Sequence, residues 1–228
     1  VDFIINTANS YLAKEVSKEN VLSVFAGLRP LAAPQDGSEK TKEISRSHKI
    51  IVSKSNLVTI TGGKWTTYRK MAQDTIDKII RMGILPKRNC VTNNIGIHGS
   101  TTDNFSDDHL KIYGSDREAI LKLVEEAPEL GEKIHPGLEF MKAEVVWAAR
   151  YEMARTVEDV LARRVRILFL DAQASIEIAP RVAKILAEEL NMDLIWQENQ
   201  VLDFKAMANK YVLKDSHYTT LSQLKTNL

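Results

Sequence analysis

The sequence predicts a mainly helical chain in which a small α+β region is followed by an all-helical region. Two observations lead to this prediction. Between residues 21 and 63 the apolar residues form short β-branched runs, whereas after Gly63 they recur about every 3.6 residues, the helical period. From about residue 100 onward the strand-like runs disappear and helical spacing continues. We therefore place a domain boundary near residue 90, with an α+β domain at 1–90 and an all-helical domain at 91–228.

The composition excludes several classes of protein. With 44% hydrophobic residues in 228, the chain can bury a real core, and 31 basic against 30 acidic residues indicate no nucleic-acid partner. Any basic patch must be local. The single cysteine, Cys90, excludes an internal disulfide and a cysteine-rich metal site. No apolar run approaches the ~20 residues that span a bilayer. The histidines lack metal-ligand spacing, so we expect no metal.

The first elements are an amphipathic helix and a strand. Residues 1–15 place Phe3, Ile4 and Leu12 at helical spacing. The run "VLSVFAGLRPL" then predicts a buried strand that ends at Pro30. A polar loop, "AAPQDGSEKTKEISRS", follows. The next run, "HKIIVSKSNLVTITGG", holds two β-branched segments around a polar turn and predicts a hairpin.

A helix is expected directly after this hairpin, and more helices fill the second region. The first of them ends at Gly83. Its apolar side comprises Tyr68, Met71, Ala72, Ile76, Ile79, Ile80 and Met82. Further on, Thr156 and Asp159 in "TVED" resemble a capping box that starts a helix running through "LARRVRILFL". The C-terminal "KDSHYTTLSQLKTNL" is polar, and we expect it to fray.

The turn "TITGGKWTTYRK" carries the clearest chemical signal, and it has three interpretations. A Walker A loop requires an upstream glycine and a Ser or Thr after the lysine, but Trp65 follows Lys64, so a P-loop is excluded. The simplest interpretation is a strand-to-helix connection in which Gly62 and Gly63 adopt unusual φ angles. The third is an anion site, because a glycine turn that opens a helix presents amide donors and a partial positive charge.

Two arginines, taken together with this lysine, favour the third interpretation, an anion site. Arg29 ends the first predicted strand, Arg46 precedes the hairpin, and Lys64 follows it. Each one alone is best read as a solvated cation. Together, at the strand ends of one small unit, they predict a site for a phosphate or a carboxylate.

These motifs carry a resemblance to a known family. The segments "FAGLRPL", "SRSHKI" and "TGGKWTTYRKMA", in this order, resemble the FAD-dependent glycerol-3-phosphate dehydrogenases. The later segment "EVVWAARYEMARTVEDVLARRVRILFLDA" is similar to the C-terminal helical domain of these enzymes. The resemblance extends from the N-terminus to about residue 205. It implies that the first 90 residues are the C-terminal piece of an FAD- and substrate-binding domain.

The resemblance also implies roles for particular residues. Arg29 would act beside the substrate as a catalytic and substrate-binding residue, and Arg46 and Lys64 would hold or orient the substrate, glycerol 3-phosphate. The turn residues would lie against the flavin. They are Gly62, Gly63, Lys64, Trp65, Thr66 and Thr67. The reaction would pass a hydride from C2 of the substrate to FAD, and the electrons would then go to a quinone.

One part of the family pattern is missing from this sequence. The G-x-G-x-x-G turn that binds the FAD pyrophosphate in these enzymes is absent, and the chain begins at Val1. We therefore expect a C-terminal fragment that is inactive and does not retain FAD. The parent enzyme is expected in the cytoplasm, at the periphery of the inner face of the cell membrane.

An alternative interpretation remains open for the helical region, as a non-catalytic interaction or oligomerisation module. Exposed strand edges in residues 21–65 also predict self-association. The remaining candidates are expected to be structural: Arg163, Arg164 and Arg166 as dipole-compatible or paired charges, and Trp147 and Trp196 as packing residues.

Overall fold

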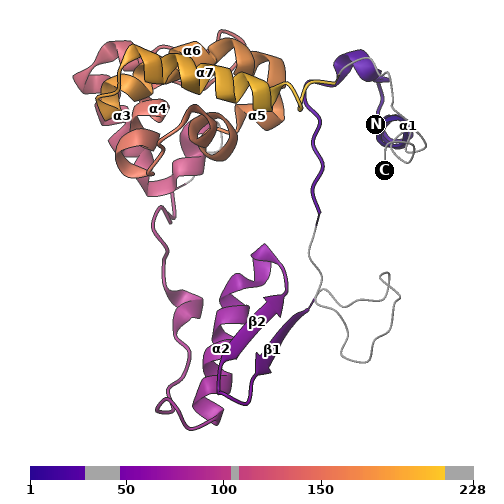
Figure 1. The fold of residues 1–228 in the computed structure, drawn as a ribbon, viewed down its shortest axis with the longest axis vertical. Helices are drawn as coiled ribbons and strands as arrows, with labels where there is room; N and C mark the ends of the chain where they lie inside the picture. The colour runs from indigo at the N-terminus through magenta and orange to yellow at the C-terminus, as the bar shows by residue number, and fades with distance from the viewer. Residues whose placement is uncertain (29–46, 104–107, 214–228) are drawn as a thin grey trace. The chain divides into compact units, whose positions relative to one another are not determined.

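The computed structural model of the chain describes residues 1–28, 47–103 and 108–213 (Figure 1). The predicted site residues Arg29 and Arg46, and the C-terminal segment predicted to fray, lie outside these residues. The described helices are α1 (Asp2–Asn9), α2 (Tyr68–Arg81), α3 (Arg117–Glu126), α4 (Lys142–Tyr151), α5 (Ile167–Leu170), α6 (Ala172–Leu190) and α7 (Leu194–Ala208). The strands are β1 (His48–Val52) and β2 (Val58–Gly62). Short 3₁₀ segments are Lys18–Asn20, Trp65–Thr67, Thr92–Asn94, His109–Asp116 and Pro128–Gly131, and Asp159–Arg164 is a π-helical turn.

The chain folds as two compact units. One comprises Gly27–His98, and the other joins Val1–Ala26 to Gly99–Leu228. We call them the hairpin unit and the helical unit. This division falls eight residues after the boundary predicted near residue 90, and it groups the first 26 residues with the helices. The reason for that grouping is a set of backbone hydrogen bonds, since the Val24 amide donates to the Tyr211 carbonyl and the Ala172 amide to the Leu22 carbonyl.

The hairpin unit contains the predicted hairpin, which is confirmed. β1 and β2 are antiparallel, in a register that pairs His48 with Gly62 and Val52 with Val58. The connection closes because the Ser53 amide donates to the Leu57 carbonyl and the Leu57 amide donates to the Ser53 hydroxyl, both at 3.0 Å. Asn56 takes the left-handed conformation, φ 63°, that this turn requires.

The helix expected after the hairpin is also confirmed. Its end is set by Gly83, which has φ +75° and donates its amide to the Ile80 carbonyl at 2.9 Å. None of the α2 residues is fully buried, and the apolar face remains partly open to solvent. The helix therefore carries more apolar surface than the hairpin beside it covers.

The strand predicted in "VLSVFAGLRPL" is wrong for the described residues 21–28. This segment is extended but forms no ladder with another strand. Its apolar side chains led to the prediction of a buried strand, yet Leu22 and Phe25 are exposed. A short extended stretch bound to helices satisfies the same apolar pattern without a sheet. The amphipathic helix predicted in residues 1–15 is present as the shorter α1.

The helical unit has a core of two apolar clusters formed by its helices, and the predicted all-helical region is confirmed. α6 packs against α4, α5 and α7, and its central residues Val182 and Leu186 are fully buried. Phe204 on α7 joins the same cluster. The predicted packing roles of the tryptophans are confirmed, because Trp147 is buried in a second cluster beside α3 and Trp196 packs against the first.

The capping box at Thr156 is confirmed, but the single helix expected after it is wrong. The Asp159 amide donates to the Thr156 hydroxyl at 3.0 Å, and the Thr156 amide donates to the Asp159 carboxylate at 3.1 Å. The helix then widens into a π-helical turn and stops at Arg166, whose φ is 60°. This break redirects the chain, so that Ile167 and Leu168 at the start of α5 reach the core.

The arginines around this break have the structural partners expected of them. Arg163 pairs with Glu158 and Asp159, and Arg164 donates to the Glu152 carbonyl. Arg166 lies over the ring of Phe169, 5.5 Å from its centroid. Within the described ranges, no helix is both long enough and apolar enough to cross a lipid bilayer.

Candidate functional site

The described part of the predicted site is the glycine turn that joins β2 to α2. β2 ends at Gly62, with φ 75°, and Gly63 follows with φ 79°. Both angles lie in the left-handed region that only glycine adopts without strain. Lys64 then returns to extended backbone, φ −136° and ψ 151°, and Trp65 begins the 3₁₀ turn that leads into α2. Two consecutive glycines are thus what allows the strand to reverse into a helix here.

Space as well as conformation requires a glycine at position 63. A Cβ atom built there would lie 2.6 Å from the Met71 sulfur and 3.2 Å from the His48 Cβ. Met71 belongs to α2 and His48 to β1. The helix and the hairpin therefore approach closely at this turn, and no side chain fits between them there.

The turn is closed by hydrogen bonds of its own. The Thr67 amide and hydroxyl both donate to the Lys64 carbonyl at 3.0 Å, and the Lys64 amide donates to the Thr67 hydroxyl at 3.3 Å. These bonds hold the first turn of the helix in place. The amides at a helix start have no intrahelical acceptors, which leaves donors and a partial positive charge at this end.

The side chains of the turn face solvent. Trp65 is 87% exposed and stacks on Tyr68, with ring centroids 5.8 Å apart. Lys64 is exposed, and its ammonium group makes no ion pair within the described ranges. An exposed ammonium group beside an exposed aromatic ring can bind a ligand that is anionic, planar or phosphorylated. The sequence analysis expected both the cation and the helix start at this place.

A second polar cluster ties α2 to β1 beneath the turn. The His48 imidazole contacts the Asp74 carboxylate at 3.0 Å, and the Lys70 ammonium donates to the same carboxylate at 2.7 Å. The hydrogen bond from Lys70, followed by that from His48, holds the pKa of Asp74 below its usual value. The contact of His48 with Asp74 was not foreseen, because it joins residues 26 positions apart that belong to no motif, whereas Lys70 and Asp74 are an i,i+4 pair on α2.

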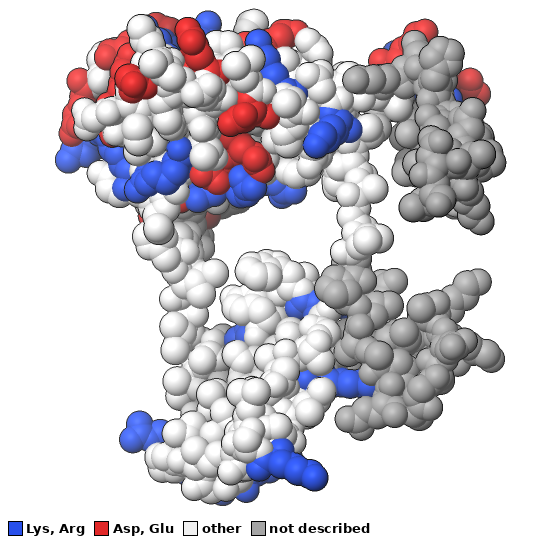
Figure 2. All heavy atoms as spheres, in the orientation of Figure 1, with Lys and Arg blue, Asp and Glu red and all other residues white. Residues whose placement is uncertain are grey.

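The described part of the hairpin unit is strongly basic, although the whole chain is nearly neutral. Residues 47–98 contain nine Lys and Arg against two Asp and Glu, a net charge of +7. The basic residues are Lys49, Lys54, Lys64, Arg69, Lys70, Lys78, Arg81, Lys87 and Arg88, and the acidic residues are Asp74 and Asp77. Figure 2 shows this excess of positive charge on one face of the hairpin unit, where Lys and Arg (blue) are visible and Asp and Glu (red) are not. Such a field favours an anionic ligand over a neutral one.

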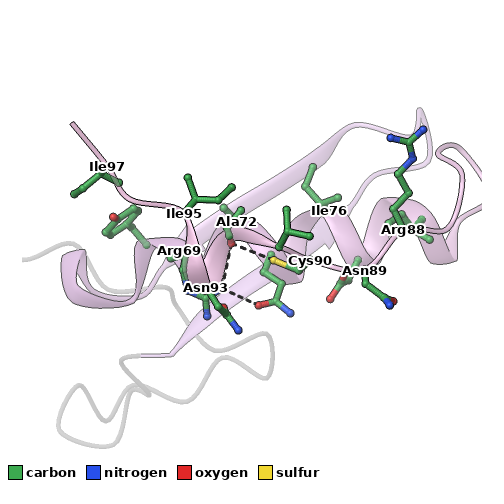
Figure 3. Close-up of a pocket in the computed structure, with 15 residues that line it drawn as sticks. Arg69, Ala72, Ile76, Arg88, Asn89, Cys90, Asn93, Ile95 and Ile97 are labelled. Atoms are coloured by element: carbon green, nitrogen blue, oxygen red, sulfur yellow. Dashed lines mark hydrogen bonds between the residues drawn. The ribbon is translucent and has the colours of Figure 1, made fainter. Parts of the chain in front are cut away.

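An apolar groove of about 670 Å³ runs along α2 (Figure 3). Ile76 and Ile80 line it from the helix, and Val91, Ile95 and Ile97 line it from the segment that follows. The sequence analysis missed this groove, because the second wall comes from an irregular segment without periodicity. The only sequence signal was the group of apolar residues at 91–97.

Polar groups lie along this groove. Arg69 donates to Gln73 at 3.0 Å and to the Thr92 hydroxyl at 3.3 Å, and the Cys90 sulfur lies 3.1 Å from the same hydroxyl. The hydrogen bonds from Thr92 lower the pKa of the Cys90 thiol. The described residues contain no cluster of His, Cys, Asp and Glu that could hold a metal ion.

Comparison with known proteins identifies a family to which this sequence is similar. A sequence model described as the C-terminal domain of alpha-glycerophosphate oxidase matches residues 53–200. Two curated relatives are a probable mitochondrial glycerol-3-phosphate dehydrogenase of Caenorhabditis elegans and the mitochondrial glycerol-3-phosphate dehydrogenase SDP6 of Arabidopsis thaliana. The first is 32% identical over 252 residues, which cover 100% of this chain and 34% of the relative. The second is 35% identical over 232 residues, which cover 88% and 37%.

A solved structure shows a similar fold. It is the glycerol-3-phosphate dehydrogenase from Bacillus halodurans complexed with FAD, with a TM-score of 0.68 and 23% identity. The match covers 94% of this chain and 46% of that one. The chain thus spans about a third of the length of the curated relatives and under half of the solved chain.

Proposed function

The chain belongs to the family of the C-terminal domain of alpha-glycerophosphate oxidase, and we propose that it acts as part of an FAD-dependent glycerol-3-phosphate dehydrogenase. Its relatives are glycerol-3-phosphate dehydrogenases by name, and the similar solved structure holds FAD, which supports this substrate and cofactor. The observation that carries the proposal is the glycine turn, where Lys64 stands unpaired among the described residues at the start of α2. The unit around it carries the positive charge that an anionic substrate and an anionic cofactor require.

The residues of the turn fit a flavin and a phosphorylated substrate. Bound FAD would supply the hydride acceptor for oxidation of C2 of glycerol 3-phosphate, which gives dihydroxyacetone phosphate. Lys64 would hold the negative charge of the phosphate, or stabilise the charge that develops as the C2 hydroxyl loses its proton. Trp65, Thr66 and Thr67 would lie against the cofactor, because they are exposed at the positive end of α2.

Arg29 and Arg46 complete the proposed set of cations. We assign Arg29 to catalysis and substrate binding, and Arg46 to the substrate. Support for both comes from their order in the sequence relative to the glycine turn. A phosphate dianion binds best to several cations together, and arginine offers two parallel donors to its oxygens.

The test is a flavin-retention experiment coupled to a turnover assay. The purified chain is mixed with FAD and passed through a desalting column, and its visible spectrum is recorded. Reduction of an artificial electron-accepting dye is then followed with glycerol 3-phosphate. We expect the 228-residue chain to lose the flavin and reduce no dye, because it lacks a G-x-G-x-x-G turn.

The same assay on the longer polypeptide that contains this sequence completes the test. It should retain FAD and reduce the dye only when glycerol 3-phosphate is present. A longer polypeptide that binds FAD but does not oxidise glycerol 3-phosphate would refute the proposed substrate. Flavin retained by the 228-residue chain would instead refute the proposal that this chain is an incomplete flavin site.

Two further parts of the proposal concern electron acceptor and location. We assign the electrons to a quinone and the enzyme to the periphery of a membrane, where the excess of Lys and Arg in residues 47–98 would favour anionic lipid. The inner face of the cell membrane is the predicted location. The relatives above are named mitochondrial, so recovery of the protein with mitochondria on cell fractionation would overturn that prediction.

A second candidate function is an interaction module formed by the helical unit. α7 exposes three large apolar side chains, Leu194, Ile195 and Leu202. In the hairpin unit, the described sheet has only two strands, so each strand keeps one unpaired edge within the described residues. Both features favour self-association. Light scattering across a concentration series tests this candidate, and a monomer at all concentrations would exclude it.

A further inference from the structure

His48 lies next to the glycine turn, between the hairpin and α2. It begins β1 and pairs in the antiparallel register with Gly62, the residue at which the turn starts. A Cβ atom at Gly63 would lie 3.2 Å from the Cβ atom of His48. α2 lies along the same hairpin (Figure 1). The first residue of β1 therefore adjoins the turn, and its imidazole reaches the helix that the turn opens.

The partner of His48 on α2 is Asp74, whose carboxylate is oriented by two donors. The His48 Nε2 atom lies 3.0 Å from Asp74 Oδ2, and the Lys70 ammonium donates to Asp74 Oδ1 at 2.7 Å. The hydrogen bond from Lys70, and then that from His48, hold the pKa of Asp74 below its usual value. At neutral pH this carboxylate can therefore only accept, so Nε2 carries the hydrogen of its contact with His48.

The contact of Asp74 lies close to a second contact between α2 and the turn. Met71 packs over Gly63, because the Met71 sulfur would lie 2.6 Å from a Cβ atom there. Asp74 follows Met71 by three residues, which places both side chains on one face of the helix, about 4.5 Å apart along its axis. The Met71 side chain is flexible, whereas the hydrogen bond between Asp74 and His48 is directional. We therefore expect the hydrogen bond to set the direction in which α2 leaves the turn.

The direction of α2 decides where the amides at its start point. The Thr67 amide donates to the Lys64 carbonyl, but the Trp65 and Thr66 amides have no acceptor among the described residues. These two donors, together with Lys64, are what the turn offers to an anion. A hydrogen bond weakens steeply as its angle departs from linear. A small tilt of the helix start would therefore weaken the bonds from both amides at once.

We propose that His48 and Asp74 are positioning residues for the anion site at the glycine turn, and that they act by holding the first turns of α2 in the direction that this site requires. The inference rests on the proposed function, because it takes the turn as the anion site of the dehydrogenase. It assigns a role to two residues that lie outside the turn, on the strand and on the helix that flank it.

Charge alone predicts the opposite effect of removing Asp74. An acid near an anion site repels the anion, so loss of the Asp74 carboxylate should strengthen anion binding if only this Coulomb interaction matters. Loss of a positioning contact should weaken binding instead. Asp77 is the matched control, since it is an acid on the same helix and makes no ion pair within the described ranges.

The test is a titration of the 228-residue chain with inorganic phosphate, followed by NMR at the amides of residues 64–66. Asp74→Ala and Asp77→Ala each replace one carboxylate on α2 by the same helix-favouring residue. The two variants therefore change net charge and helix propensity alike, and only Asp74→Ala removes the partner of His48.

Two substitutions of His48 separate positioning from loss of the fold. His48→Phe keeps a ring at this place but removes the donor to Asp74, and His48→Gln keeps an N–H donor. Hydrogen exchange at the Ile51 amide is measured in every variant, because it reports whether the hairpin is still formed. Exchange at Ile51 should stay as slow in His48→Phe as in His48→Gln.

We expect the dissociation constant for phosphate to rise about fivefold in Asp74→Ala, the factor that corresponds to one typical hydrogen bond. In Asp77→Ala it should stay the same or fall. His48→Phe should raise it by roughly the same factor as Asp74→Ala, and His48→Gln should keep it within about twofold of the unsubstituted value. A dissociation constant that falls in Asp74→Ala, as charge alone predicts, would overturn the inference.

The same experiment distinguishes failure of the inference from failure of the proposed function. If phosphate shifts none of the amides of residues 64–66 in the unsubstituted chain, the inference is overturned, because there is then no anion site to position. The proposed function is still decided by dye reduction in the longer polypeptide. If that polypeptide oxidises glycerol 3-phosphate, Asp74→Ala should raise its KM with little change in kcat, and an unchanged KM would also overturn the inference.

Discussion

Replacing Gly63 with alanine tests the structural basis of the glycine turn. The substitution adds one methyl group at a residue whose φ is +79°, and that methyl would lie 2.6 Å from the Met71 sulfur and 3.2 Å from the His48 Cβ. Gly83 offers a matched control, since its φ is +75° and no atom lies within 4 Å of an added Cβ. The two alanine variants therefore share the backbone strain and differ in the steric clash.

The expected magnitudes follow from these two terms. A left-handed conformation costs a non-glycine residue about 1–2 kcal/mol, which is the whole effect expected for Gly83→Ala. Overpacking adds typically about 1–3 kcal/mol, so Gly63→Ala should cost roughly 2–5 kcal/mol. Because the Met71 sulfur belongs to a flexible side chain, Met71→Ala should relieve most of the added cost. The double variant should then be more stable than the sum of the two single effects predicts.

The assay is native-state hydrogen exchange at Ile51 and Thr59, which pair in the hairpin two residues from the hydrogen-bonded Ser53 and Leu57 and whose amides therefore face the partner strand. Exchange there reports the free energy of opening of the hairpin unit separately from that of the helical unit. Gly63→Ala should lower this free energy more than Gly83→Ala does. Equal losses in the two variants, or no rescue by Met71→Ala, would refute the conclusion that close approach of α2 requires a glycine at position 63.

Three further predictions concern the helical unit and its charges. Thr156→Ala removes the hydroxyl that accepts from the Asp159 amide and should cost about 1 kcal/mol in chemical unfolding, so an unchanged midpoint would contradict the capping role. The amide of Leu110 and the guanidinium of Arg117 hold the pKa of Asp108 below its ordinary 3.8, so this carboxylate stabilises the fold above that pH and loses its contribution as the pH falls through the native pKa. In the Asp108→Asn variant the free energy of unfolding should therefore fall less steeply as the pH is lowered from roughly 5 to 2. In Asp103→Asn this fall should be the same as in the unsubstituted chain. Replacing Glu144 by Ala should destabilise the unit more than Glu139→Ala does, because it strips the buried Tyr113 hydroxyl of its acceptor, and equal effects in thermal unfolding would contradict this.

The sequence predicted those parts of the fold that local interactions determine. The hairpin, the helix after Gly63, its end at Gly83 and the capping box at Thr156 each depend on residues within a few positions of one another. The helical spacing of the second region likewise reflects one apolar face per helix. These features were predictable because local preference and tertiary packing agree.

The features that sequence reasoning missed depend on contacts between distant residues. The run at residues 21–28 has the composition of a strand, but its hydrogen-bond partners are Leu168, Ala172 and Tyr211 of the helical unit, not a neighbouring strand. Glu144 lies in the first turn of α4, where an acid is usually exposed. Here it is fully buried, and it accepts hydrogen bonds from Tyr113 and the Met141 amide and contacts His109. Burial raises the pKa of Glu144.

The candidate site was predictable only in part. Lys64 and the glycines were identified because a lysine after two glycines at a strand-to-helix junction can bind an anion at the start of the helix. The contact between His48 and Asp74, and the groove along α2, could not be predicted, since both bring together segments whose separation in sequence carries no signal.

The most direct test of the proposed function is the effect of Lys64→Met on the oxidation of glycerol 3-phosphate by the longer polypeptide. Lys54→Met, in the hairpin turn of the same unit, is the matched control, because it removes the same charge away from the glycine turn. We expect kcat/KM to fall roughly 10- to 100-fold for Lys64→Met, as for loss of a charged hydrogen bond, and to change less than twofold for Lys54→Met. Equal values of kcat/KM in the two variants, with FAD bound in both, would contradict the assignment of Lys64 to the substrate site.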